Sequence, residues 1–112
     1  IFKLVTLNKR DADPRHQYKD RFLSPGFFQW QSQNRTPQSG KIGQKILKHR
    51  QEGTAIHLFV RRDGKIQGKA APYIYCGDMD FVEWEGEKPI TVKWKLHEPV
   101  PAELHSILDV PI

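Results

Sequence analysis

The feature that most constrains the fold is a strict alternation of apolar and polar residues near the C-terminal end. In PITVKWKL the apolar members are Ile90, Val92, Trp94 and Leu96, and the polar members are Thr91, Lys93 and Lys95. Successive side chains of a β-strand point to opposite faces, so the pattern predicts a strand with one buried face and one wet face. Such a strand needs further strands and an apolar layer to cover it.

Further segments carry strand signals. Residues 2–8 form a short apolar run, and Phe27–Gln31 follows a turn predicted at Ser24-Pro25-Gly26. The segment TAIHLFVRR alternates with its apolar positions on one face, and Asp63-Gly64 after it predicts a hairpin leading into KIQGKAAPYIYCG. Residues 79–85 add a strand, which a turn at residues 85–88 joins to the alternating segment.

One helix is predicted, over KIGQKILKHRQEG. Ile42, Ile46 and Leu47 form an apolar stripe at helical spacing, and Gly53 stands where a C-terminal cap is expected. A final helical turn is expected within residues 102–108. The fold class is therefore mainly β (α+β), a small and mostly antiparallel barrel of about six strands with one main helix, since closure would remove exposed strand edges.

The chain length fits a single domain over residues 1–112. The chain begins without Met, in the strand-like IFKLVTL, so we expect a domain excised from a larger protein. Cys76 is the only cysteine, which excludes an internal disulfide, and no segment has the apolar length of a signal peptide or membrane span. A bacterial cytoplasmic location and no membrane partner are expected.

Charge is distributed unevenly along the chain. Residues 1–62 hold 13 Lys and Arg against 4 Asp and Glu, a balance of +9, whereas residues 63–112 hold 5 against 9, a balance of −4. A basic half attracts polyanions and releases counterions from phosphates, so nucleic acid is the leading partner. The alternative reading is a solvated basic surface that serves solubility.

Motifs for catalysis are missing from the sequence. SGKIGQK has the wrong spacing for a phosphate-binding loop, and the five His residues show no paired metal-ligand spacing. The acidic residues from Asp78 to Glu87 alternate as on a solvated strand, and Cys76 follows Tyr75 without a nearby His. We therefore expect no catalytic residue, no metal and no cofactor in this domain.

The segment FFQWQSQNRT suits recognition of a base. Trp30 offers a stacking surface, and a run of amides and a hydroxyl follows it. Phe59, Tyr73 and Tyr75 come from two other segments that can reach the same pocket. The predicted base-binding residues are Trp30, Gln31, Ser32, Gln33, Asn34, Phe59, Tyr73 and Tyr75. The alternative is that these aromatic side chains are core residues and that Gln33 and Asn34 cap a turn.

Basic side chains form a second candidate group. Lys41, Lys45 and Lys48 fall on one face of the predicted helix, next to His49 and Arg50, where they either meet phosphates or form a solvated face. The predicted phosphate-binding residues are Arg35, Lys41, Lys45, Lys48, Arg61 and Arg62. Arg10 and Arg15 add only to the overall charge.

The order of several short motifs resembles a known family. FQWQSQN, SGKIGQ, HRQEG, LFVRRDGKIQGKAAPYIYCG and KPITVKWKLHEPVPAEL follow one another as in the C-terminal domain of uncharacterised function of many bacterial superfamily-two (DEAD/DEAH-type) helicases. The resemblance covers the chain from about Tyr18 to Leu104. It implies preceding phospholipase-D-like nuclease and helicase domains, and ATP and Mg²⁺ belong to that absent helicase domain.

Some of the helicases whose C-terminal domain this chain resembles are modification-dependent restriction enzymes of phage defence. The resemblance then implies a target-recognition module for methylated cytosine in double-stranded DNA, with an architecture similar to the SRA and PUA barrels that flip bases. In that hypothesis Trp30 and Tyr73 or Tyr75 stack on the flipped base, and the amides read its edge. The alternatives are a protein-interaction or autoinhibitory domain that docks on the helicase, and a non-specific basic DNA clamp.

Overall fold

The structure is a computed structural model that describes residues 1–8, 20–32 and 36–111. Within these residues a six-stranded sheet curls into a half-barrel, with the strand order β1-β4-β7-β8-β3-β2. Its strands are β1 (Phe2–Thr6), β2 (Arg21–Ser24), β3 (Phe27–Gln31), β4 (Ile56–Arg61), β7 (Ile74–Glu85) and β8 (Thr91–Leu96). The mainly β class with one main helix is thereby confirmed.

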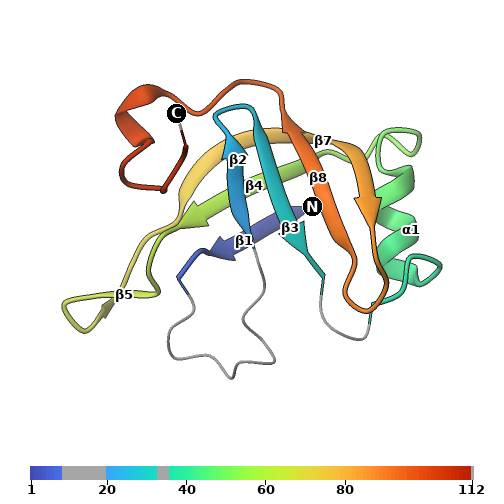
Figure 1. The fold of residues 1–112 in the computed structure, drawn as a ribbon, viewed down its shortest axis with the longest axis horizontal. Coiled ribbons are helices and arrows are strands. Elements are labelled where there is room, and N and C mark those ends of the chain that lie inside the picture. The colour runs from blue at the N-terminus through green and yellow to red at the C-terminus, as the bar shows by residue number, and fades with distance from the viewer. Residues whose placement is uncertain (9–19, 33–35, 112) are drawn as a thin grey trace.

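The long strand β7 joins two halves of the sheet. Its first part pairs with β4, which pairs with β1, and its last part pairs with β8, which leads to β3 and β2. Register shifts lie at Leu58/Phe59 and Phe81/Glu83, so β7 bends and the second half crosses over the first (Figure 1). Among the described residues, the β1–β4 pair of this sheet is parallel and its other pairs are antiparallel.

The core lies between the two halves of the sheet. The predicted alternation of β8 is confirmed, because Val92, Trp94 and Leu96 are buried there. The predicted alternation of β4 is confirmed as well, since Ile56, Leu58 and Val60 are buried beside residues 57, 59 and 61, which are partly exposed. Phe22 and Phe28 also share this interior, with ring centroids 4.9 Å apart. Burying this apolar area is the main stabilising term of the fold.

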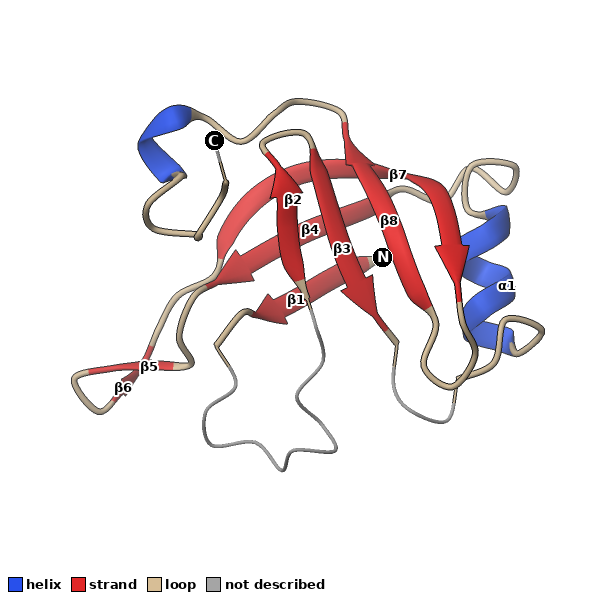
Figure 2. Cartoon of the chain, in the orientation of Figure 1, coloured by secondary structure: helices blue, strands red, loops and turns tan. Residues whose placement is uncertain are grey.

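The helix is shorter and less buried than the sequence predicts. α1 runs over Lys41–Lys48 at one end of the half-barrel, with turns from residue 49 to residue 53 (Figure 2). Ile46 is buried, but Ile42 and Leu47 are 50% and 44% exposed, so the predicted three-residue stripe is wrong for two of its members. The short helix contacts the sheet end with one side only.

The hairpin predicted at Asp63-Gly64 is displaced along the chain. β4 pairs with β7, and the connection between them projects as a small ribbon of β5 (Lys65–Ile66) and β6 (Lys69–Ala70). The ribbon turns at Gln67 and Gly68, whose φ angles are 52° and 79°, as tight hairpin turns require. The C-terminal segment lies at the same end of the molecule as this ribbon (Figure 1) and contains a 3₁₀ turn, η2 (Ala102–Leu104), in the predicted region.

Candidate nucleic-acid interface

The outer face of β1, β4 and β7 carries a group of aromatic side chains. Cross-strand register places Phe2 beside His57 and Phe59 beside Tyr75. The ring centroid of Phe2 lies 5.5 Å from those of His57 and Phe59, and the centroids of Phe59 and Tyr75 are 4.9 Å apart. Phe2 is 70% exposed and Tyr75 is 51% exposed. We call Phe2, His57, Phe59 and Tyr75 the outer aromatic face.

A cation lies at one end of this face. The Arg61 guanidinium carbon is 4.3 Å from the centroid of the Tyr73 ring, a cation–π distance. Arg61 Nε donates to Thr6 Oγ1 at 2.9 Å, and Nη1 donates to the Ala71 carbonyl oxygen at 2.9 Å. Two predicted residues, Tyr73 and Arg61, therefore form one fixed unit in which Arg61 is an anchored charge.

The β5–β6 ribbon continues from this end and adds further cations. Lys65 and Lys69 are both exposed on it. Arg62 is differently placed, because its Nε lies 3.3 Å from Asp63 Oδ2 and its Nη1 donates to the Ser106 carbonyl oxygen at 3.4 Å. The ribbon lysines are thus better placed for phosphates than the predicted Arg62.

A hollow of about 470 Å³ opens beside Tyr75. One wall comes from the start of β7, from Tyr75 to Asp78, and the other comes from the segment that follows β8. The second wall contains His97, Glu98, Pro99, Val100, Pro101 and Leu104. Apolar walls with a few polar groups are typical of small-ligand sites. We call this cavity the Tyr75 hollow.

Asp78 is the fixed polar group of the Tyr75 hollow. Its Oδ1 accepts a hydrogen bond of 2.9 Å from the Tyr75 hydroxyl and lies 3.1 Å from His57 Nδ1. The nearest nitrogen of His97 is 3.9 Å from Oδ2, beyond hydrogen-bond distance. The Tyr75 hydrogen bond holds the pKa of Asp78 below its ordinary value, with help from the two histidines, and the same bond raises the pKa of Tyr75. Asp78 is therefore a carboxylate at neutral pH, which only accepts hydrogen bonds.

His97 lies between Asp78 and a second acidic residue, and its hydrogen bond is with the second one. Its Nε2 lies 2.9 Å from Asp80 Oδ2, and Arg50 Nε lies 3.7 Å from Asp80 Oδ1. Although His and Asp alternate here, no group of three or more His, Cys, Asp or Glu in the described residues has the arrangement of a metal site. The chain of contacts orients His97 at the mouth of the hollow.

Trp30 lies in the interior of the half-barrel, where it packs partly buried against the core. The Lys3 ammonium is 3.6 Å from its ring centroid. Burial lowers the pKa of Lys3 from 10.5 to about 8, although the charge of Asp20 opposes this shift. Trp30 and the Tyr75 ring are on opposite faces of the sheet, so the structure does not form the predicted sandwich between them.

The residues after Trp30 have structural partners. Ser32 is 1% exposed, and its Oγ accepts a hydrogen bond of 2.8 Å from the Ile90 backbone N–H. The backbone N–H of Gln31 donates to Asp20 Oδ1, and its side-chain Nε2 donates to Thr91 Oγ1. Ser32 therefore has no accessible edge for a base. The predicted Gln33, Asn34 and Arg35 lie outside the described residues.

The predicted lysines of α1 are exposed but lie apart from the other cations. Lys41, Lys45 and Lys48 are on the helix at one end of the molecule's long axis, and the β5–β6 ribbon is at the other end (Figure 1). His49 is 2% exposed rather than part of a basic ridge. Its Nε2 accepts from the Phe81 backbone N–H at 3.1 Å and its Nδ1 lies 3.0 Å from the Thr54 carbonyl oxygen. The helix lysines thus form a separate basic surface.

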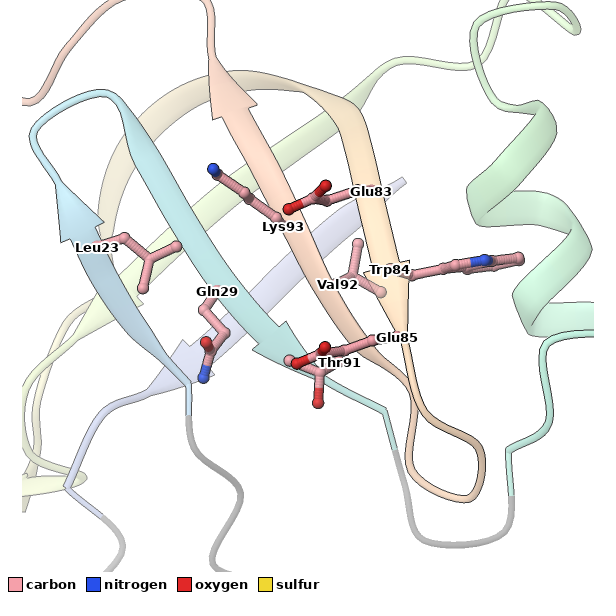
Figure 3. A pocket seen from close by; sticks show the side chains of 8 residues that line it. All are labelled: Leu23, Gln29, Glu83, Trp84, Glu85, Thr91, Val92 and Lys93. Atoms are coloured by element: carbon pink, nitrogen blue, oxygen red, sulfur yellow. The ribbon is translucent and has the colours of Figure 1, made fainter.

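A second hollow, of about 320 Å³, lies over the other half of the sheet. Figure 3 shows Gln29 and Lys93 on neighbouring strands, with Glu83 and Glu85 beside them on β7 and Trp84 directed toward α1. Two carboxylates with one ammonium give this surface an acidic balance. It is therefore poorly suited to the phosphates of a nucleic acid.

The candidate interface also contains residues that the sequence does not predict: Phe2, His57, Lys65, Lys69, Asp78 and His97. Phe2 pairs with a strand far along the chain, a relation that periodicity does not reveal. The sequence alone predicts Asp78 to be one of the alternating acids of a solvated strand, and only the fold brings His97 beside it. The alternation of β4, however, already placed His57 on the same face as Phe59, and this signal was available.

Comparison with known proteins gives one family. Residues 1–108 match the family described as Domain of unknown function (DUF3427). No curated protein matches the chain. In the described part of the chain, no helix has both the length and the apolar character needed to cross a membrane.

Proposed function

The chain belongs to the DUF3427 family, whose description leaves its function open, and we propose that it is a DNA target-recognition module that captures an extruded base in the Tyr75 hollow. The observation that carries the proposal is the pairing of an aromatic side chain with a fixed carboxylate at the mouth of an apolar cavity. An extruded base needs a stacking surface and polar groups for its Watson–Crick edge. Tyr75 offers the first and Asp78 the second.

The chemistry of Asp78 favours cytosine over thymine. A carboxylate accepts a hydrogen bond from the cytosine N4 amino group, whereas thymine presents the O4 acceptor at that position. Oδ2 is the Asp78 oxygen proposed to accept this hydrogen bond, because Oδ1 already accepts one from the Tyr75 hydroxyl. The Pro99 and Val100 side of the hollow offers apolar contact for a methyl group at C5 of the base. These features fit a modified cytosine of the 5-methylcytosine class.

In the larger protein implied by the resemblance to helicase C-terminal domains, this module supplies recognition rather than catalysis. ATP hydrolysis and DNA cleavage then belong to preceding helicase and phospholipase-D-like nuclease domains, and this domain needs no cofactor of its own. The balance of +5 on the chain and the exposed ribbon lysines favour binding to a polyanion. Such a system works in the bacterial cytoplasm.

The test is fluorescence anisotropy of the domain with matched duplexes across a salt series. The duplexes carry 5-methylcytosine, cytosine or thymine at one central mismatched position. We expect tighter binding to the cytosine duplexes than to the thymine duplex, and Asp78→Asn to remove most of that preference. Glu83→Gln is the matched control, because Glu83 is a carboxylate of the same strand that lines the other hollow and not the Tyr75 hollow. Equal binding of all duplexes by the unmodified domain would leave a non-specific DNA clamp, and no binding would favour docking on the helicase.

A further inference from the structure

The outer aromatic face has more exposed ring surface than a single base pocket uses. Phe2 is 70% exposed and its neighbour Leu4 is 60% exposed, so the apolar surface extends across β1 away from the Tyr75 hollow. These side chains face outward, because the alternate residue Val5 points into the core and is 3% exposed. A contiguous exposed apolar patch is typical of a binding surface.

The face also has a direction. Cross-strand register orders it in rows, with Phe2 and His57 in one row, Phe59 and Tyr75 in the next, and Arg61 beyond them. The cations of Arg61 and the β5–β6 ribbon lie at one end, and the carboxylate of Asp78 lies at the other end, next to His57. A strand of nucleic acid has bases that stack on rings and phosphates that need cations. Only the end with Arg61 and the ribbon lysines has the positive charge that the phosphates require.

We propose that the outer aromatic face binds single-stranded DNA, with unpaired bases stacked on Phe2 and Phe59 and phosphates held at the Arg61 and ribbon end. This is a second binding mode, which adjoins the Tyr75 hollow and shares the Tyr75 ring with it but uses Phe2 and Phe59, which do not line the hollow. Aromatic rings accept any base, because every base has a π-face, so the surface binds without sequence preference. The strand it takes is an unpaired one, since the bases of a duplex are stacked on one another and unavailable.

The experiment measures binding of a labelled twelve-residue oligothymidine to the 112-residue domain by fluorescence anisotropy. Thymine has no exocyclic amino group, so this ligand is insensitive to the cytosine preference proposed for Asp78. The variants Phe2→Leu and Phe59→Leu remove a ring but keep an apolar side chain on each strand. Val82→Ala is the control, because Val82 is an exposed apolar residue of β7 that lies outside the outer aromatic face.

We expect each Leu variant to weaken oligothymidine binding by about 5-fold to 100-fold, the range seen when a stacking side chain is lost. The Val82→Ala variant is expected to bind oligothymidine as tightly as the wild type. The Leu variants are expected to bind the matching duplex with no comparable loss of affinity. Urea denaturation of each variant separates lost stacking from lost folding. Oligothymidine binding that the Leu variants leave unchanged would overturn the proposal, as would a lack of any oligothymidine binding. The cytosine preference of mismatched duplexes tests the Tyr75 hollow independently of either outcome.

Discussion

The ammonium of Lys3 on β1 lies 3.6 Å from the centroid of the Trp30 ring on β3, across the interior of the half-barrel. β1 and β3 are not neighbours in the sheet order, so this contact joins its two halves. The ring face that Lys3 covers is not available to a base. Trp30 therefore packs inside the half-barrel with one ring face covered, where the sequence predicts a stacking surface for a base.

The pH dependence of stability is expected to report this buried amine. Burial lowers the pKa of Lys3 to about 8 in the folded chain, against 10.5 in the unfolded chain, so the unfolded state binds more protons between these values. The contribution of Lys3 to stability should rise as pH increases from 8 to 10.5, by about 3 kcal/mol, and stay constant below pH 7. The difference in the free energy of unfolding between the wild type and Lys3→Met, measured by urea denaturation at each pH, isolates the contribution of Lys3. A difference that falls over this range would mean that attraction to the Trp30 ring dominates.

Replacement of Trp30 by Ala is expected to destabilise the domain rather than to abolish recognition selectively. Trp30 packs partly buried against the core, so its removal should cost about 2–3 kcal/mol. Urea denaturation gives this value, and anisotropy gives the ratio of cytosine to thymine duplex affinity. We expect an unchanged ratio in conditions where the variant is folded. A lost ratio with unchanged stability would restore the sequence-based hypothesis.

Ser32→Ala should also act on stability. The change leaves the Ile90 backbone N–H without its acceptor in a site that is 1% exposed at Ser32, which should cost about 1–3 kcal/mol. Thr91→Val, on the same β3–β8 pairing but partly exposed, is the comparison and should cost less. Chemical denaturation of both variants is the measurement. Equal costs would show that the Ser32 hydroxyl is not the critical acceptor.

Salt dependence should distinguish the two basic surfaces at the ends of the molecule. The double change of Lys65 and Lys69 to Ala is expected to reduce the slope of log affinity against log salt for oligothymidine by about 1.4, since each phosphate contact contributes about 0.7. The matched change of Lys45 and Lys48 to Ala on α1 should leave the slope unaltered. The reverse result would move the phosphate path to the helix.

The strands were predictable where one face of a strand is buried and the other is wet. Residues Phe27–Gln31 form β3 as predicted, and the turn before it lies at Pro25 and Gly26. Alternation also identified β4 and β8. These predictions succeed because the alternation of apolar and polar residues within a single strand indicates which of its side chains are buried.

The arrangement of the strands in space was not predictable in the same way. Phe59 and Tyr75 meet, and Trp30 is separated from them, because register shifts at Leu58/Phe59 and Phe81/Glu83 bend β7. Such bulges depend on pairing between strands, which no single segment encodes. Gly77, with φ of 95°, lies on β7 at the first of these register shifts. The sequence thus predicts one pocket for these aromatic residues, whereas the fold places them on two faces of the sheet.

The parallel pairing of β1 with β4 has a consequence for the order of folding. Thr6 and Arg61 are 55 residues apart in sequence, so β1 joins the sheet only after a long loop closes. The hairpin of β7 and β8 needs only a short connection and is expected to form early. The strand that carries Phe2 is then a late addition, which among the described residues pairs with β4 alone, and a ligand stacked on Phe2 would hold it in place. Ligand binding and completion of the sheet would thus favour each other.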